Sequence, residues 1–168
     1  MMQRNEPWLV ESAITLIRNY LWALPIGKRN YRVDGFVFEF GSGASTKWFS
    51  ELCNNVVSVE HDERFDQVVL GVEQFFQPRP YNQVIETFKD DYFDLILVDG
   101  RDRVKCVESS ISKLKSGGWL VLDNSERVYY QKGMDLMKDW NRIDCRQNRP
   151  DKYDFIYPDW QTSIFIKP

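Results

Sequence analysis

The sequence has few residues of the kinds that bind zinc or form disulfides. It contains one histidine, His61, and three cysteines, Cys53, Cys106 and Cys145, without a C-x-x-C pair. Zinc sites need several such ligands at short spacing, so the sequence argues against one. An odd, widely spaced set of cysteines is also unlike the disulfide framework of a secreted domain. We therefore expect reduced thiols and a cytoplasmic protein.

Long apolar runs and concentrated charge are also lacking. No apolar stretch approaches the about 20 residues that a membrane-spanning helix requires, so no membrane span is predicted. Glu6 and Glu11 interrupt the first apolar residues, and no small-residue cleavage site follows, which is unlike a secretory signal. The net charge is only −3 and the basic residues are dispersed, which argues against a nucleic-acid partner.

The apolar content is sufficient for one core. With 168 residues and 43% apolar side chains, the chain is expected to form a single domain over residues 1–168. Residues 1–34 would supply an N-terminal helix and the loop that leads into the first strand. Apolar residues recur at three- and four-residue steps over 6–24, which predicts a helix capped by Asn5 and ended by Pro25.

The rest of the chain alternates between predicted strands and helices. The expected strands are 36–40, 55–60, 72–77, 93–100, 119–123, 142–146 and 162–167, and the expected helical segments follow Gly43 and cover 63–71, 81–88, 103–115 (stopped by Gly117 and Gly118) and 129–140. Alternation with continuously apolar strands predicts an α/β fold, a Rossmann-like three-layer sandwich with a mostly parallel sheet.

Carboxylates stand where the predicted parallel strands end. Glu39, Glu60, Asp99 and Asp123 each follow an apolar run. Ligands of such sheets bind beyond the carboxyl ends of the strands, at the point where the strand order reverses. These four residues are therefore expected near one ligand site.

The segment after Glu39 predicts a nucleoside site. Gly41 and Gly43 allow a tight turn and a close approach to a ligand, and the helix that follows presents free N–H groups. Glu60 lies about 20 residues further on, where a carboxylate can accept hydrogen bonds from ribose hydroxyls. A dinucleotide motif would have a third glycine where Thr46 stands. Because Glu39 disfavours a pyrophosphate, the cationic cofactor S-adenosylmethionine fits better.

These motifs resemble those of a known family, the class I S-adenosylmethionine-dependent methyltransferases. The matching stretches are VFEFGSGAST, VVSVEHD, FDLILVDGR and LKSGGWLVLDN, within roughly residues 35–128. The resemblance is closest to compact small-molecule or sugar O-methyltransferases. It implies a seven-stranded sheet in the order 3-2-1-4-5-7-6, with the last strand antiparallel.

The resemblance also implies roles for individual residues around the cofactor. Glu39 would orient the methionine ammonium through water or backbone, and Glu60 would bind the ribose. Methionine and ribose would be lined by Gly41, Ser42 and Gly43, and the sulfonium would lie above Asp99 and Gly100. His61 would flank the adenine, or would be a surface residue after a strand.

One position departs from the family pattern. The acidic residue that often reads adenine after the third strand is replaced by Gln77. Adenine recognition would then fall to backbone groups.

Two interpretations of the acceptor side remain open. Asp99, Asp123 and Asn124 are oxygen ligands spaced as in metal-dependent catechol-type O-methyltransferases, which predicts a Mg²⁺ site. Alternatively, Asp-Asn forms a turn, and Asp123 with Glu126 forms a capping box that starts the next helix. Without a metal, Asp99 is the first candidate for the general base and His61 the second.

The acceptor is expected to be a small molecule or a glycan with a hydroxyl group. Arg101 and Arg103 lie at a predicted helix start, where the dipole disfavours cations. They either face an anionic or sugar-rich acceptor or are solvated surface residues. Tyr129 and Tyr130 are further candidate acceptor contacts. An open pocket would suit a glycan end and a glycosyltransferase as partner.

Two rival functions are an NAD-dependent oxidoreductase and a non-catalytic cofactor-binding module. The first lacks the third glycine and a Tyr-x-x-x-Lys pair. The second is compatible with the small size of the chain.

Overall fold

The computed structural model describes residues 7–28, 31–65, 68–148 and 159–168. Its strands are β1 (Val33–Phe40), β2 (Cys53–Glu60), β3 (Val72–Phe76), β4 (Phe93–Val98), β5 (Leu114–Asp123), β6 (Asn141–Asn148) and β7 (Asp159–Ile166). Its helices are α1 (Glu11–Trp22), α2 (Ala44–Leu52), α3 (Arg103–Ser110) and α4 (Gln131–Asp135), with 3-10 turns η1 (Glu63–Phe65), η2 (Tyr81–Thr87) and η3 (Val128–Tyr130).

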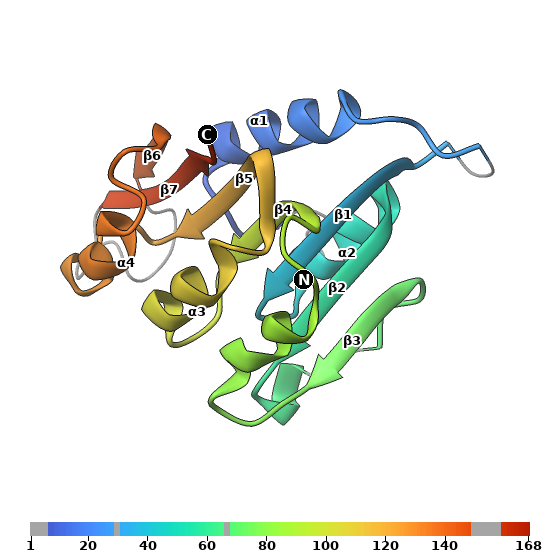
Figure 1. Cartoon of the computed structure of the whole chain (residues 1–168), viewed down its shortest axis with the longest axis horizontal. Helices are drawn as coiled ribbons and strands as arrows, with labels where there is room; N and C mark the ends of the chain where they lie inside the picture. The colour runs from blue at the N-terminus through green and yellow to red at the C-terminus, as the bar shows by residue number, and fades with distance from the viewer. Residues whose placement is uncertain (1–6, 29–30, 66–67, 149–158) are drawn as a thin grey trace.

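The seven strands form one sheet in the order β3-β2-β1-β4-β5-β7-β6 (Figure 1). β7 runs antiparallel to both of its neighbours, β5 and β6, and the pairs from β3 to β5 are parallel. The predicted α/β class, strand order and antiparallel last strand are confirmed.

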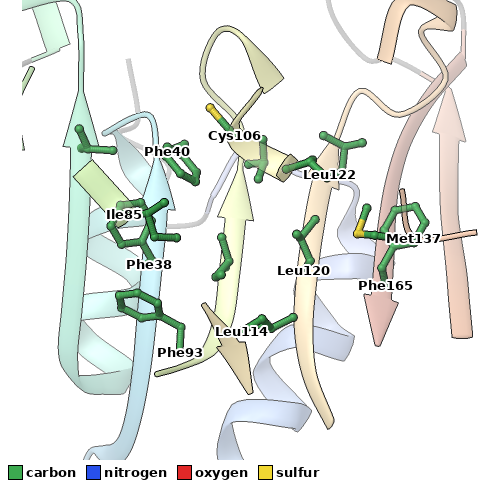
Figure 2. Close-up of a cluster of buried hydrophobic side chains, with 14 of the residues drawn as sticks. Phe38, Phe40, Ile85, Phe93, Cys106, Leu114, Leu120, Leu122, Met137 and Phe165 are labelled. Carbon is green, nitrogen blue, oxygen red and sulfur yellow. The ribbon is translucent and has the colours of Figure 1, made fainter. Parts of the chain in front are cut away.

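Helices cover both faces of the sheet, so the central strands are apolar on both sides. Val37, Leu95 and Val121 pack with α1 and α2 on one face. On the other face, η2, α3 and α4 cover a cluster to which β1, β4, β5 and β7 all contribute (Figure 2). Phe38 and Phe40 lie in this cluster, and each fully buried side chain of this size contributes about 1.5–3 kcal/mol to stability. The carboxyl ends of the central strands are therefore held rigidly in place.

The helix predicted over 6–24 is shorter in the structure. It begins at Glu11, because the N–H of Val10 donates to the Thr162 hydroxyl (3.2 Å) and the Val10 backbone stays extended. The proposed cap, Asn5, lies outside the described residues. Within the part of the chain that the structure describes, no helix is both long and apolar enough to cross a membrane.

Other predicted helix bounds were wrong. After η1, Val68 and Leu70 are exposed, so the apolar spacing predicted over 63–71 does not face the core. The helix predicted over 103–115 ends at Ser110, and Gly117 and Gly118 belong to β5. A Cβ on Gly118 would lie 3.0 Å from the Asp94 carbonyl oxygen, so glycine here serves close strand approach rather than a helix stop.

The helix predicted over 129–140 is also fragmented. It consists of η3 and the short α4, which is followed by turns before β6 begins at Asn141.

Candidate cofactor and active site

A cavity of about 650 Å³ opens at the carboxyl ends of β1, β2, β4 and β5. This volume falls within the about 300–1,000 Å³ typical of small-molecule sites. Four segments and one separate residue line it: 41–45 after β1; Glu60, His61, Asp62, Arg64 and Phe65 after β2; Asp99, Gly100, Arg101 and Arg103 after β4; Asn124, Arg127 and Tyr130 after β5; and Trp8 before α1.

The cavity gathers most of the residues predicted from the sequence. Gly41, Ser42, Gly43, Glu60, His61, Asp99, Gly100, Arg101, Asn124 and Tyr130 all line it. Three predicted residues, Glu39, Asp123 and Tyr129, are not part of its lining.

Glu39 lies beneath the glycine loop, with no exposed surface. Its carboxyl group accepts hydrogen bonds from the hydroxyls of Ser45, Thr46 (2.6 Å) and Ser58 (3.3 Å). Thr46 Oγ1 in turn accepts the N–H of Gly43 (2.9 Å). The residue that replaces the third glycine of the dinucleotide motif therefore connects the loop to the buried carboxyl group.

Burial raises the pKa of Glu39 from 4.5 to about 7. The three hydroxyl bonds oppose this shift but do not cancel it. The charge of Glu39 can therefore respond to a charged ligand near neutral pH.

Two glycines allow the loops after β1 and β4 to meet. Gly41 has φ +98°, and a Cβ on it would lie 3.1 Å from the Cα and N of Gly100. A Cβ on Gly100 would collide with the hydroxyl of Tyr81. Gly43 is different, because its φ of 173° is extended and no atom lies within 4 Å of where its Cβ would be.

Glu60 is held in place by backbone N–H groups. Its Oε2 accepts from Ser42 N (2.8 Å), and its Oε1 accepts from His61 N (2.7 Å) and Asp62 N (2.9 Å). A carboxylate offers about four acceptor positions. Glu60 therefore retains the capacity to accept a hydrogen bond from a ligand hydroxyl.

His61 forms part of the cavity wall. Its ring stacks on Tyr81 at 5.1 Å between centroids, and its Nδ1 lies 2.8 Å from Glu60 Oε1 without the alignment of a hydrogen bond. Only 20% of its side chain is exposed, which does not fit the alternative of a surface residue. Gln77 does not line the cavity; its side chain donates to the Pro78 carbonyl (3.4 Å).

Tyr81 contacts both His61, which follows β2, and the loop that follows β4. Its hydroxyl accepts from Arg101 N (2.6 Å) and donates to the Arg101 carbonyl (2.7 Å). Sequence reasoning did not select Tyr81, because it lies on η2 and outside every motif.

Arg103, the first residue of α3, is only 6% exposed, so the expectation of a solvated arginine was wrong for this position. Its Nε donates to the Gly100 carbonyl (2.9 Å), and its Nη2 donates to both Asp99 O and Asp99 Oδ1 (3.0 Å each). Its Nη1 donates to the Asp123 carbonyl, and its guanidinium lies over the Tyr130 ring. Arg101, by contrast, is exposed at the cavity rim.

Asp123 is engaged on the side away from the cavity. Its Oδ1 accepts from Trp160 Nε1 (3.0 Å) and from the Thr162 hydroxyl (2.7 Å). Asn124 has φ +52° and begins a turn, as the turn alternative predicted. The capping-box alternative was wrong, because Glu126 Oε2 accepts from Gln161 N (3.0 Å) and no helix follows directly.

Two of the predicted metal ligands, Asp99 and Asp123, are bonded to the guanidinium of Arg103. Among the described residues, no group of three or more His, Cys, Asp and Glu side chains could hold a metal ion. Asp99 and Asp123 lie beside each other, but the guanidinium of Arg103 is bonded across them.

The pKa of Asp99 is raised well above its ordinary value, first by burial and then by the charge of Asp123. Arg103 opposes the shift. Asp99 still has 29% of its side chain exposed, toward the cavity that it lines, so it is accessible to a ligand.

Tyr129 stands outside the cavity. It is 57% exposed, packs edge-on against Tyr130, and its hydroxyl accepts from Arg127 Nη1 (3.1 Å). Arg127 lines the cavity and was not selected from the sequence.

Many solved structures share this fold. A Staphylococcus aureus protein whose assignment as a caffeoyl-CoA O-methyltransferase is provisional matches with a TM-score of 0.66 and 17% identity, over 96% of this chain and 86% of that one. An rRNA methylase from Streptococcus thermophilus matches with a TM-score of 0.62 and 11% identity, over 100% and 99%. Spermidine synthase from Thermotoga maritima matches with a TM-score of 0.56 and 12% identity, over 80% and 55%.

No family model matches the sequence. No curated protein matches it either. The structural matches and the strand order nevertheless show that the chain has the Rossmann-like fold of the S-adenosylmethionine-dependent methyltransferases, although the sequence identities are low.

The contrast between Gly41 and Gly43 can be tested by substitution. Gly41→Ala should lower the free energy of unfolding by about 1–3 kcal/mol, because alanine is strained at its positive φ. Gly43→Ala is the matched control, and should leave that free energy unchanged or raise it by up to about 1 kcal/mol. Urea denaturation measures both. Equal effects would contradict the loop geometry.

Glu39 should make stability depend on pH. Its folded pKa of about 7 lies above its ordinary 4.5, so its neutral form stabilises the fold below pH 4.5. This contribution is lost as pH rises through 7. Between pH 4.5 and pH 8, the free energy of unfolding of Glu39→Gln should therefore fall by about 3 kcal/mol less than that of the unmodified chain.

The comparison needs denaturation curves at pH 4.5 and pH 8 for the unmodified chain and the variant. Glu51→Gln, an exposed position on α2, is the control and should keep the wild-type difference. An unchanged difference in Glu39→Gln would show that Glu39 is not the group responsible.

Proposed function

We propose that this protein is an S-adenosylmethionine-dependent methyltransferase that methylates a hydroxyl group of a sugar, glycan or other small molecule. One observation carries the proposal. A carboxylate fixed by backbone N–H groups, Glu60, faces the same cavity as the glycine loop and Asp99. Matches to methyltransferases across the length of the chain support it.

The residues around the cavity fit this cofactor. Glu60 would bind the ribose hydroxyls, and Gly43, where no atom is close to the Cβ position, leaves room for the ligand. The buried carboxyl group of Glu39 lies directly behind the loop and, with Asp99, favours a cationic ligand there. A pyrophosphate in the cavity would face Asp99 and lie near the buried charge of Glu39, so NAD fits less well.

The protein would mainly position the acceptor and remove its proton. The bound cofactor would supply an electrophilic methyl group on a sulfonium. The acceptor hydroxyl would lose its proton to Asp99 as its oxygen takes the methyl group. Asp99 is the first candidate base because it lines the cavity, and burial together with the charge of Asp123 raises its pKa, which makes its carboxylate a stronger proton acceptor. His61 is the second.

The acceptor would lie between the loops after β4 and β5. Arg101 and Tyr130 line this side, and Tyr129 stands further out. The arrangement suits a polar, hydroxylated acceptor such as a glycan end. A glycosyltransferase partner and a cytoplasmic location remain predictions from the sequence.

Cofactor choice can be tested by calorimetric titration. S-adenosylmethionine should bind the unmodified chain, and NAD should not. Glu60→Gln should weaken binding by about 10- to 100-fold, because it replaces a charged hydrogen-bond acceptor. Glu63→Gln is the control, since Glu63 lies three residues on and does not line the cavity. No binding of S-adenosylmethionine, or equal affinity in both variants, would contradict the assignment.

A methyl-transfer assay distinguishes an enzyme from a binding module. With a labelled methyl donor and a panel of sugar, glycan and phenolic hydroxyls, we expect label transfer to at least one acceptor. Asp99→Asn should lower kcat by about 100-fold or more, as expected for loss of a general base. Asp90→Asn, at an exposed ion pair with Lys113, should leave it unchanged. Cofactor binding without any transfer would favour the non-catalytic module.

A further inference from the structure

A positive charge already lies where a divalent ion would bind. In sheets of this kind, the carboxyl ends of β4 and β5 place Asp99 next to Asp123. The Arg103 guanidinium is bonded to the Asp99 carboxylate and to the backbone carbonyls of Asp99, Gly100 and Asp123. These are oxygen atoms, the atoms that Mg²⁺ would use as ligands.

The position of Arg103 is fixed by the fold. Asp102, the residue before Arg103, has φ +49°, so the chain turns sharply as it enters α3. The Tyr130 ring lies 5.2 Å from the guanidinium carbon on the other side. Arg103 is thus enclosed by α3, η3 and both strand ends, and its side chain is 7% exposed.

With Arg103 in place, little is left for an ion to bind. Asp123 Oδ1 already accepts hydrogen bonds from Trp160 and Thr162 of β7, which leaves Oδ2 as the oxygen of this carboxyl group that an ion could use if Arg103 were removed. Removing both donors would disturb the pairing of β7 with β5. An ion at this place would have to displace Arg103 and leave a buried guanidinium without its partners.

We propose that Arg103 replaces the divalent cation in this site, holding Asp99 against the cavity and making methyl transfer independent of an added metal. Arg103 is then a positioning residue, because it acts through Asp99 rather than on the acceptor. The inference concerns the site of the proposed function, but its first test does not depend on activity.

Manganese binding provides that test. The full chain, freed of metals with a chelator, is titrated with Mn²⁺ and the free ion is followed by electron paramagnetic resonance. The unmodified chain should show no site tighter than about 1 mM. Arg103→Met should bind one Mn²⁺ at least about tenfold more tightly, because the two carboxyl groups lose their built-in cation. The double variant Arg103→Met, Asp123→Asn should bind Mn²⁺ no more tightly than the unmodified chain.

Arg79→Met is the matched control, since it removes an arginine from an exposed ion pair with Asp102, outside the cavity. It should gain no Mn²⁺ site. One tight Mn²⁺ site in the unmodified chain that Asp123→Asn abolishes would overturn the proposal, and so would a folded Arg103→Met that gains nothing. If Arg103→Met does not fold, the titration of the unmodified chain and of Asp123→Asn decides.

Activity gives a separate readout. Once an acceptor is found, a chelator should change kcat by less than about twofold, whereas a metal-dependent enzyme would lose activity. Loss of activity with chelator, restored by Mg²⁺, would overturn the inference while leaving the methyltransferase assignment intact. A chain that binds no cofactor would refute the assignment, and the Mn²⁺ titration would still decide the role of Arg103.

Discussion

The shape of the site depends on the hydrogen bonds that the buried carboxyl group of Glu39 accepts. Glu39 lies one residue before the end of β1, in the interior of the sheet, and burial there is costly unless hydrogen bonds compensate for the lost water. Ser45 and Thr46, from the first turn of α2, and Ser58 from β2 provide those bonds. The same bonds fix the glycine loop, so its shape follows from the need to satisfy Glu39.

Three acidic residues at the strand ends around the cavity are hydrogen-bonded in three different ways. Glu39 receives hydroxyl groups, Glu60 receives backbone N–H groups, and Asp99 receives a guanidinium. The first arrangement leaves a group with a pKa near neutrality, and the second leaves a fixed acceptor for a ligand. The third leaves a carboxyl group that faces the cavity beside a buried positive charge. These differences separate a region suited to a cofactor from one suited to proton removal.

Much of this could be predicted from the sequence, and the failures have physical causes. Continuous apolar runs such as 95–98 identified central strands, and the resemblance to the methyltransferase family predicted the strand order. Arg103 was judged by its place at a helix start, where dipole arguments assume exposure. Its burial depends on α3 lying over both strand ends, which no local pattern records. The apolar spacing over 63–71 was misleading because Val68 and Leu70 have nothing to pack against.

Tyr81 has a consequence for how the two halves of the cavity communicate. Its ring stacks on His61 after β2, while its hydroxyl holds the backbone of Arg101 after β4. A single rigid aromatic group is therefore shared by both walls. Neither wall can shift without straining the other, so the two walls should move as one mechanical unit rather than independently.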